Sequence, residues 1–357
     1  MKIRDRIIAA LTWNEIDYVP WAVKPNHLPR GYWERELRNK GLGLTLEVRV
    51  FKITMPNVTY EHKFIGDLII KTYITPLGSL SEKIRRGLPS EAGERSDQWR
   101  VESLIKAPDD YKVLEFMIED MKIRPNYNDF IIIDKELGPD GITYTSIGYT
   151  PLMEIIVNYM GFRTFALEIK KRPEKVEELI EHLHEKKLEI CRIVAKSPAK
   201  FVLLGDNIDE VLVDPRFFKR YCIPYYQEYV EILHKSGKIV GSHMDGRLKK
   251  LKELILETGL DFIHGFTPPP YGNLSIKEAR ECWKENIALW VNIPETVFYY
   301  EPVHIEEFIK CLLKEGAPGN GLMLGITETV PPTRRRIGYE SITNAVLKYG
   351  KYPIRIC

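Results

Sequence analysis

The segment Lys238-Ile-Val-Gly-Ser-His-Met-Asp-Gly246 decides how the rest of this sequence is interpreted. Its first half is apolar or small and predicts a short buried strand, and its second half places His243 and Asp245 at the strand's exit. A charged helical pattern follows directly. An apolar strand that ends in polar groups at a turn is how α/β proteins present reactive side chains on a rigid base. We therefore expect a functional site here, joined by the ends of other strands.

The same pattern of strand and helix repeats along the C-terminal two-thirds of the chain. Short apolar runs are followed by helices with recognisable starts, such as Asp214-Pro-Arg-Phe-Phe218. Such repetition calls for parallel strands joined by right-handed crossovers. Eight segments qualify as barrel strands, near Val19, Val48, Tyr144, Val202, Ile239, Ile263, Leu289 and Met323. Eight strands, without a G-x-G-x-x-G turn after the first, favour an α/β fold of the (β/α)8 TIM barrel type over a dinucleotide-binding sheet.

The N-terminal part is less regular than the remainder. We expect one domain over residues 1–357, in which residues 1–130 supply the first strands and elaborations of the barrel. Residues 24–44 are rich in Pro, Gly and Arg and predict an irregular segment with one short helix, whereas Glu47-Val-Arg-Val-Phe51 alternates like a half-buried strand. The period-two pattern of residues 58–73 predicts an antiparallel hairpin outside the main sheet.

Composition and charge exclude several classes of protein. The 52 basic and 50 acidic residues leave a net charge of +2, which gives no electrostatic footprint for nucleic acid or a membrane surface. No stretch approaches the ~20 continuous apolar residues of a membrane span, and the N-terminus lacks the apolar core of a signal peptide. Five scattered cysteines without a C-x-x-C spacing fit reduced thiols. We expect a soluble cytoplasmic protein.

In a barrel of this type the active site lies at the C-terminal ends of the strands. The polar residues expected there are, in chain order, Tyr149, Asp206, Asn207, His243, Asp245, His264, Asn292, Thr327 and Glu328. Polar turns are common in any loop, but two of only eight histidines, His243 and His264, fall at adjacent strand ends. We predict that Asn207 and Asn292, together with Arg30 from the N-terminal part, contact the substrate.

His243, Asp245 and Glu328 form the predicted metal site. One imidazole and two carboxylates, with one position left open, match the three-ligand pattern of catalytic zinc. The alternative is that His243 caps the strand end by a hydrogen bond to Asp245 or Asp206, without a metal.

Tyr149, Asp206 and His264 are the predicted catalytic residues. Asp206 can serve as a general base or support a metal ligand, and the alternative is an N-cap for the turn that follows it. His264 can orient the substrate or donate a proton. The alternative for His264 is simple packing under the loop at Pro268–Pro270.

Several short segments from Tyr149 onward point to a known superfamily. They are Tyr149-Thr-Pro151, Gly161-Phe-Arg-Thr-Phe165, Arg172-Pro-Glu-Lys-Val176, Asp214-Pro-Arg-Phe-Phe218, His243-Met-Asp-Gly246, Thr258-Gly-Leu-Asp-Phe-Ile263 and Tyr349-Gly-Lys-Tyr-Pro353. In these segments, and in their order, the chain resembles the uroporphyrinogen decarboxylase superfamily. The resemblance covers about two-thirds of the chain. It implies a (β/α)8 barrel, in agreement with the strand count.

The resemblance implies one of two chemistries, of which the first is cofactor-free decarboxylation. True uroporphyrinogen decarboxylases hold the substrate's carboxylates with an Arg-x-x-x-Arg segment after a Pro-x-Trp strand, and use a C-terminal histidine. Here Val19-Pro-Trp-Ala-Val23 is followed only by Lys24 and Arg30, and Gly325–Pro332 contains no histidine. A substrate with many carboxylates needs several fixed cations. A carboxy-lyase acting on a tetrapyrrole is therefore the alternative and not the leading function.

The second implied chemistry is that of the cobamide-dependent methyltransferases, which use zinc. In the thiol-methylating members, a His-x-Cys strand end and a later cysteine bind the metal, and Asp245 and Glu328 stand near those two positions here. Carboxylates make zinc a harder Lewis acid, suited to polarising an ether or alcohol oxygen. The sequence therefore predicts a zinc-dependent demethylating methyltransferase. It would pass a methyl group from a small methoxy or similar donor to a corrinoid carried by a separate protein.

A third interpretation is a non-enzymatic barrel that binds a corrinoid or tetrapyrrole. It predicts a pocket without metal and an affinity that survives His243→Ala. Whether the chain forms a homodimer is left open by the sequence.

Overall fold

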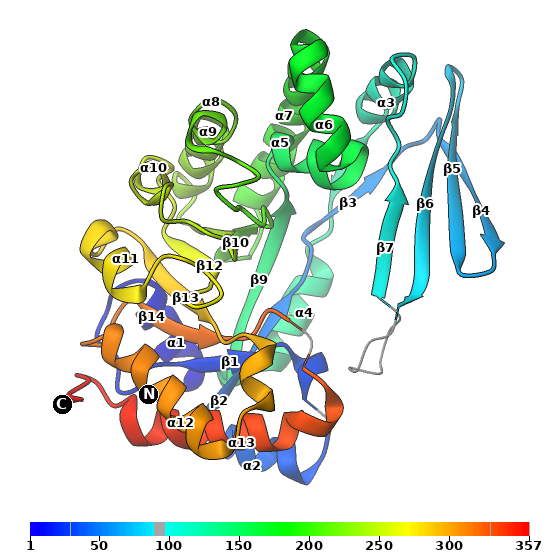
Figure 1. Ribbon diagram of the computed structural model, residues 1–357. Helices are drawn as coiled ribbons and strands as arrows, with labels where there is room; N and C mark the ends of the chain where they lie inside the picture. Colours follow the sequence, from blue (N-terminus) through cyan, green and yellow to red (C-terminus); the bar gives the residue numbers. More distant parts are fainter. Residues whose placement is uncertain (29, 89–96, 329, 357) are drawn as a thin grey trace.

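Eight parallel strands close into a barrel in the computed structural model, which describes residues 1–28, 30–88, 97–328 and 330–356 (Figure 1). Around the barrel they follow the order β1-β14-β13-β12-β11-β10-β9-β2. The strands are β1 (Trp21–Val23), β2 (Leu42–Glu47), β9 (Gly141–Gly148), β10 (Phe201–Leu204), β11 (Ile239–His243), β12 (Phe262–Phe266), β13 (Ala288–Asn292) and β14 (Leu322–Gly325). The predicted (β/α)8 barrel is confirmed.

The helices that cover the barrel start where the sequence signals them. Asp214 caps α8 (Pro215–Tyr221), because its carboxylate accepts two backbone N–H groups of the first turn. Ser275 opens α11 (Ile276–Trp283) with a reciprocal capping box. The other helices are α2 (Tyr32–Asn39), α4 (Asn128–Leu137), α5 (Pro151–Glu154), a π-helical turn (Ile155–Met160), α6 (Gly161–Lys171), α7 (Pro173–Ala195), α9 (Ile223–His234), α10 (Lys252–Leu256), α12 (Pro302–Glu315) and α13 (Pro332–Tyr349).

The second barrel strand lies earlier in the chain than predicted. The expected strand at Glu47–Phe51 is wrong, since β2 covers Leu42–Glu47 and residues 48–50 belong to no strand. The first four residues of β2 are buried on both faces, as in most parallel strands, so they lack the alternation that the prediction relied on. The segment at residues 24–44, predicted to be irregular, contains the start of this strand.

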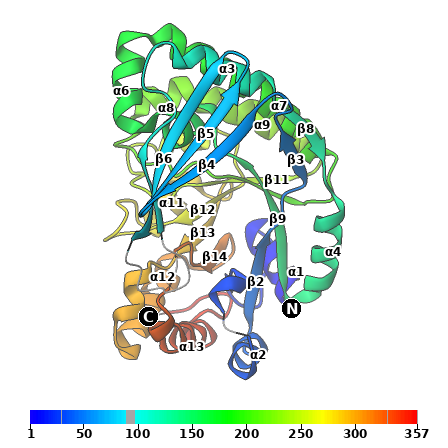
Figure 2. The ribbon, with the colours of Figure 1, turned by 90° about the vertical axis from the view of Figure 1, so that its right-hand side faces the viewer.

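The N-terminal elaborations form two small antiparallel sheets beside the barrel. β3 (Phe51–Thr54) pairs with β8 (Lys122–Pro125). The predicted hairpin is confirmed as part of a larger sheet, in which β4 (Thr59–Ile65), β5 (Leu68–Thr75), β6 (Gly78–Leu88) and β7 (Asp97–Glu102) are neighbours in that order. Helix α3 (Asp110–Glu119) follows β7. Figure 2 views the molecule from the side on which this sheet stands.

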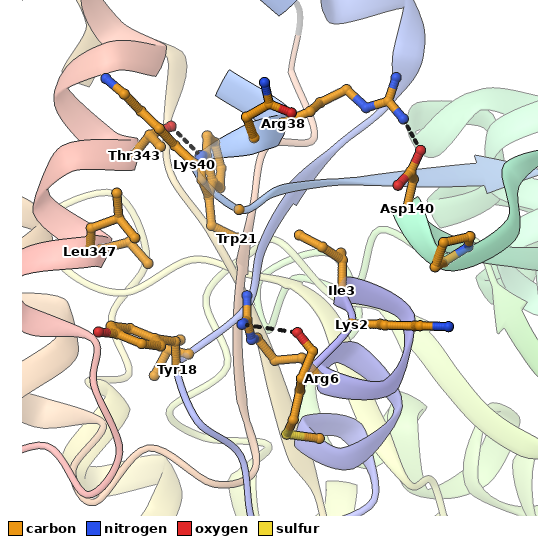
Figure 3. Close-up of a pocket in the computed structure, with 16 residues that line it drawn as sticks. Lys2, Ile3, Arg6, Tyr18, Trp21, Arg38, Lys40, Asp140, Thr343 and Leu347 are labelled. Atoms are coloured by element: carbon orange, nitrogen blue, oxygen red, sulfur yellow. Dashed lines mark hydrogen bonds and ion pairs between the residues drawn. The ribbon is translucent and has the colours of Figure 1, made fainter. Parts of the chain in front are cut away.

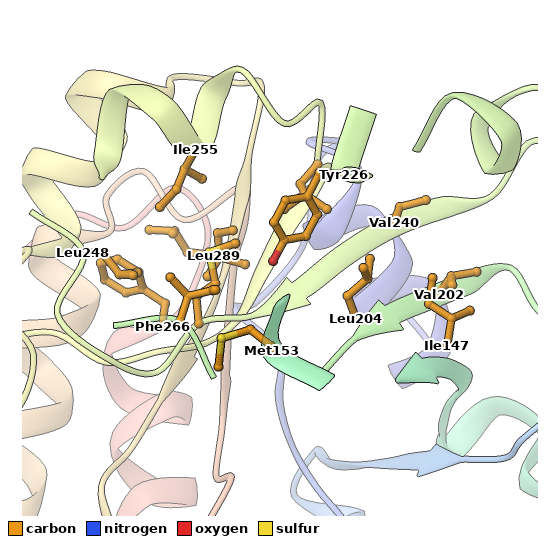
Figure 4. Close-up of a cluster of buried hydrophobic side chains, with 14 of the residues drawn as sticks. Ile147, Met153, Val202, Leu204, Tyr226, Val240, Leu248, Ile255, Phe266 and Leu289 are labelled. Atoms are coloured by element: carbon orange, nitrogen blue, oxygen red, sulfur yellow. The ribbon is translucent and has the colours of Figure 1, made fainter. Parts of the chain in front are cut away.

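Two hydrophobic layers hold the barrel together. Outside the strands, Val202, Leu204 and Val240 belong to one buried cluster with helical residues such as Tyr226 and Ile255 (Figure 4). Inside the barrel lies a separate cluster that includes Tyr144, Phe201, Leu203, Phe262, Trp290 and Met323. Burial of this apolar area, at roughly 25 cal/mol per Å², is the main favourable term for a fold of this kind.

The N-terminal end of the barrel is plugged by α1 (Ile3–Leu11). Ile7 and Leu11 of this helix are fully buried and belong to the interior cluster. The plug leaves the C-terminal end as the face at which polar strand ends can meet a ligand. None of the helices in the described ranges is long and apolar enough to cross a membrane.

Candidate active site

His243 and His264 lie side by side at the C-terminal mouth of the barrel. They belong to the neighbouring strands β11 and β12, whose parallel pairing puts the two residues in register. Their Nδ1 atoms are 2.8 Å apart, and their ring centroids are 4.9 Å apart. One Nδ1 must carry the hydrogen of this bond and the other must accept it. The two strand ends that stood out in the sequence therefore form one hydrogen-bonded pair.

His264 rests on the aromatic floor of the barrel and does not pack under a proline loop alone. Its ring meets the edge of Trp290 at a centroid distance of 4.5 Å, and Tyr144 lies 6.4 Å away. Burial holds the pKa of His264 well below its ordinary value, and the charges of His243 and Lys24 lower it further. His264 is therefore neutral at physiological pH, and one of its ring nitrogens carries a free lone pair.

Asp245 faces the other ring nitrogen of His243. The distance from Nε2 of His243 to Oδ2 of Asp245 is 3.5 Å, longer than the ~2.8 Å of a good charge-assisted hydrogen bond. Burial alone would raise the pKa of Asp245, but the hydrogen bond and charge of His243 bring it below its usual range. The Asp245 carboxylate is therefore ionised at neutral pH.

Gly265 makes room for the His243 ring. A Cβ at this position would lie 2.5 Å from Cε1 and 2.6 Å from Nδ1 of His243, and 3.4 Å from Cγ2 of Thr327. The backbone of Gly265 also has a φ of +76°, which disfavours any residue with a Cβ. At Gly265, Thr327 of the loop after β14 therefore lies close to the histidine pair.

Asn292 holds Glu328 at this edge of the mouth. The fully buried Asn292 side chain donates from Nδ2 to Oε1 of Glu328 at 2.8 Å, and its Oδ1 accepts the Thr327 backbone N–H at 3.0 Å. The second carboxylate oxygen, Oε2, is buried and has no hydrogen-bond partner among the described residues. An unpaired buried carboxylate oxygen calls for a ligand, a proton or an ion. Asn292, predicted to bind substrate, thus directly orients a predicted metal ligand.

The three predicted metal ligands are not gathered into one cluster. Within the described part of the chain, no three His, Cys, Asp or Glu side chains are close enough together to hold a metal ion. His243 and Asp245 form a facing pair, and Glu328 comes from the loop after β14. The donor types still fit zinc, which accepts imidazole nitrogen and carboxylate oxygen.

Asp206 is a fully buried carboxylate behind the histidine pair. It accepts hydrogen bonds from the Tyr226 hydroxyl at 2.5 Å, the Ser242 hydroxyl at 3.3 Å and the backbone N–H of Thr150. Ser242 precedes His243 in β11, so the two side chains point to opposite faces of the strand. Burial raises the pKa of Asp206, although its hydrogen bonds oppose the change. Asp206 therefore ties β9 and β11 to α9, and its catalytic role stays a prediction.

The remaining predicted residues surround the mouth at different depths. Burial raises the pKa of Tyr149, as do the charges of Glu154 and Asp206, so this hydroxyl keeps its proton. Asn207 is exposed on a backbone with a φ of +49°. Arg30 is 72% exposed and donates to Glu34 at 3.0 Å. A role for either side chain in substrate binding stays a prediction.

Lys24 was not predicted to belong to the site. Lys24 directly follows β1, and its charge contributes to the low pKa of His264. Its position immediately after a barrel strand was the available signal. The inward-facing Trp290 and Tyr144 could not be recognised, because a barrel interior and an outer core give the same apolar pattern.

A cavity of about 420 Å³ opens at the opposite, N-terminal end (Figure 3). Trp21 and Ile3 line its apolar part, and basic residues stand around it. Two of these are paired with acids, because Arg6 donates to Asp17 at 2.5 Å and Arg38 bonds to Asp140. The cavity lies beside the α1 plug and far from the strand ends that carry the histidine pair.

Comparison with known proteins agrees with this architecture. The family model for uroporphyrinogen decarboxylase (URO-D) matches residues 145–333, more than half of the chain. The chain therefore belongs to the uroporphyrinogen decarboxylase family. The search of curated proteins gave no match.

Solved structures with the same fold are distant in sequence. A methyltransferase from Methanosarcina mazei is 13% identical, with a TM-score of 0.59, and the match covers 98% of this chain and 99% of that one. A Bacteroidetes-affiliated GH5 cellulase is 7% identical, with a TM-score of 0.42 and coverages of 97% and 95%. At such identities, the first similarity shows a shared fold over the full chain and the second carries no weight.

Proposed function

We propose that this chain is a zinc-dependent methyltransferase. It takes a methyl group from a small methoxy compound and passes it to the cobalt of a corrinoid carried by a separate protein. The proposal is supported by membership of the URO-D family and by the fold shared with the Methanosarcina methyltransferase. The observation that carries it is the arrangement of His243 between His264 and Asp245.

A neutral His264 can accept the hydrogen of the Nδ1–Nδ1 contact, whereas in the other tautomer Nε2–H of His243 donates to Asp245 and lowers the pKa of that carboxylate. When Nδ1 of His264 accepts, Nδ1–H of His243 is the donor, and Nε2 of His243 presents a lone pair to the Asp245 carboxylate. A lone pair and an anion repel each other unless a cation or proton lies between them. Metal-binding histidines commonly donate their second ring N–H to a neighbouring acceptor, which fixes the tautomer. His264 would supply that acceptor.

The separation of the two donor atoms also suits zinc. Two ligands bound at about 2.05 Å on a tetrahedral centre are roughly 3.3 Å apart. Nε2 of His243 and Oδ2 of Asp245 are 3.5 Å apart. Glu328 is the candidate for the third ligand, through Oε2, the buried oxygen that lacks a partner among the described residues.

Bound zinc would act as a Lewis acid that polarises the ether oxygen of the methyl donor. The chain's own residues do the rest. Asn292 holds Glu328 through Oε1, and Gly265 leaves space for the His243 ring. Tyr149 keeps its proton and can donate a hydrogen bond to the oxygen that leaves as the methyl group departs. Lys24 adds positive charge on the side of β1.

Decarboxylation of a tetrapyrrole is less well supported, although the family carries that name. A polycarboxylate substrate needs several converging cations. Lys24 is a cation whose charge lowers the pKa of His264, whereas Arg30 is exposed and already paired with Glu34. Uroporphyrinogen III is therefore the appropriate negative control substrate.

The proposal is tested by supplying the chain with zinc, a methoxy-aromatic or methoxy-aliphatic donor and cob(I)alamin or a reduced corrinoid protein. In the reaction, the donor's C–O bond breaks and a C–Co bond forms, so that Co(I) becomes methyl-Co(III) and the alkoxide takes a proton. The visible absorption change of the corrinoid and the demethylated alcohol should appear in equal amounts. Glu328→Gln should abolish both, while Glu136→Gln on the exposed surface of α4 should not. Formation of coproporphyrinogen from uroporphyrinogen III without methyl transfer would contradict the proposal.

A further inference from the structure

The outer strand of the four-stranded sheet is open to a partner. β4 (Thr59–Ile65) is an edge strand and lies farthest from the barrel (Figure 1). All seven of its residues are exposed, including Tyr60 at 65% and Phe64 at 59%. Natural proteins protect such an edge by a proline, a bulge, a covering segment or charged side chains. Here the charges are Glu61 and Lys63, which repel only a partner with like charges at the opposed positions. β4 contains no proline, and it pairs with β5 at every position without a bulge.

The hairpin turn decides which backbone groups of β4 face outward. Ile65 pairs with Leu68 across the two-residue turn Gly66-Asp67. Residues that flank such a turn form a hydrogen-bonded pair, and hydrogen-bonded pairs alternate along an antiparallel ladder. The odd-numbered residues of β4 therefore bond to β5. The even-numbered residues Tyr60, His62 and Phe64 point their N–H and C=O groups to the free edge.

The side chains of β4 are complementary to those of a second β4. When two copies run antiparallel with His62 opposite His62, Glu61 of each copy stands opposite Lys63 of the other. In the same register, Tyr60 stands opposite Phe64 on the other face of the sheet. Opposite charges and aromatic pairs at directly opposed positions are the favourable combinations in antiparallel sheets. We propose that two copies of this chain associate through β4 in this register.

The neighbouring registers are unfavourable. The outward hydrogen-bonding groups lie on even-numbered residues, so the register can change only in steps that keep even residues opposite even residues. One such step places Lys63 opposite Lys63, and the step in the other direction places Glu61 opposite Glu61. Like charges directly opposite each other destabilise a sheet. The proposed register alone pairs both acids with both lysines.

The position of the sheet leaves space for this association. β7 is the strand nearest the barrel and β4 is the farthest in Figure 1. A twofold axis beside β4 therefore places the two barrels on opposite sides of a continuous sheet, with four strands from each copy. Pairing of edge strands buries a small area, so we expect a weak dimer with a Kd of roughly micromolar magnitude.

Charge reversal tests the register directly by sedimentation analysis over a range of protein concentrations. Glu61→Lys and Lys63→Glu should each weaken the dimer by about tenfold or more, because each change turns two attractive pairs into repulsive ones. An equimolar mixture of the two variants should regain the wild-type dimer, since one copy then carries only lysines and the other only glutamates. Recovery in the mixture excludes misfolding as the cause of the loss.

The matched controls are Glu136→Lys and Lys135→Glu, which make the same changes on the exposed part of α4. Neither control should alter the sedimentation of the chain. A monomer at every concentration would overturn the proposal. So would a dimer that Glu61→Lys and Lys63→Glu leave unchanged, because it would have to use another surface. The inference does not depend on the methyltransferase activity.

Discussion

The two ends of the barrel are built in opposite ways. At the N-terminal end, α1 inserts Ile7 and Leu11 into the interior, and the charges around it are matched by nearby partners. Arg4 makes two bonds with the Asp134 carboxylate, at 2.9 and 3.1 Å, and Arg6 does so with Asp17. Among the described residues, no helix fills the C-terminal end in this way. The polar groups there range from the fully buried Asn292 to the exposed Asp245, and they are only partly matched.

The mismatches at the C-terminal end concern a few defined atoms. Nε2 of His243 is 3.5 Å from the Asp245 carboxylate, and Oε2 of Glu328 is buried without a partner in the part of the chain that the structure describes. The buried Glu328 oxygen costs free energy in a protein without a ligand, since a buried polar atom that lacks a partner costs about 1–3 kcal/mol. The His243–Asp245 pair costs less, because the Asp245 side chain is exposed. The N-terminal end is therefore built for stability, whereas the C-terminal end keeps unpaired polar atoms that a ligand can satisfy. Substitutions should therefore affect stability at one end and function at the other.

The largest effect is expected from His243→Ala at the mouth. Loss of the central ligand should reduce methyl transfer by roughly 10³-fold, because metal activation contributes several kcal/mol of transition-state stabilisation. The thermal midpoint should fall by only a few degrees, since the ring is partly exposed and the main loss is its hydrogen bond to buried His264. Steady-state kinetics and differential scanning calorimetry on the same preparation check both statements. Activity within a few-fold of wild type would remove His243 from the mechanism.

The converse is expected from Leu11→Ala in the plug. Removal of this buried side chain should lower the free energy of unfolding by about 2–5 kcal/mol, because it leaves a cavity inside the barrel. The activity of the folded fraction should stay unchanged. Urea denaturation gives the stability, and the control Leu11→Met should cost less than about 1.5 kcal/mol. A drop in the turnover number of fully folded Leu11→Ala protein would mean that the two ends are coupled.

Gly265→Ala should separate positioning from stability at the mouth. Its new Cβ would collide with the His243 ring, which lies 2.5 Å from that position, and must displace it. A displacement of this size should reduce turnover by about 10- to 100-fold. Gly237→Ala is the matched control, since Gly237 has a similar φ of +69° and a Cβ there meets no atom within 4 Å. Equal kinetics for the two variants would show that the exact place of the ring is unimportant.

The smallest effect is expected from Asp17→Asn at the N-terminal end. Burial would raise the pKa of Asp17, but hydrogen bonds from Arg6 and neighbouring groups bring it below its ordinary value. Ionised Asp17 therefore stabilises the fold above its unfolded-state pKa of ~3.9, and this contribution is lost as the pH falls through the lower folded-state pKa. The substitution should cost about 0.5–1 kcal/mol at pH 7, because the pair is partly exposed. Denaturation curves should show a smaller difference at pH 3, and an equal or larger one would contradict the assignment.

The sequence was sufficient to predict which strand ends meet at the C-terminal mouth, but not which side chains contact each other there. His243 and His264 could be predicted as neighbours, because parallel strands in a barrel bring their carboxyl ends to one face. Their direct Nδ1 contact could not, since it depends on the absence of a side chain at Gly265. The hydrogen bond by which Asn292 orients Glu328 could not be predicted for a similar reason. A hydrogen bond between two loops leaves no periodic signal.

The barrel as a whole was predictable, and one strand boundary was not. Strands with capped helices between them repeat regularly from Tyr144 onward, so local signals and the global fold agree there. The bounds of β2 were predicted wrongly, because Leu42–Leu44 is buried on both faces and follows a segment rich in Pro, Gly and Arg. The position of Asp206 behind β11 could not be predicted from the sequence either. A carboxylate at a strand end can turn toward the mouth or toward the surrounding helices.

The central claim is that the unmatched donors at the mouth hold zinc. The most direct test is the zinc content of the purified chain after equilibrium dialysis against buffered zinc, measured by elemental analysis. We predict one zinc per wild-type chain, a large loss in His243→Ala and Asp245→Ala, and no loss in Glu136→Gln. A wild-type chain that retains no zinc, or variants that retain as much as wild type, would contradict the account.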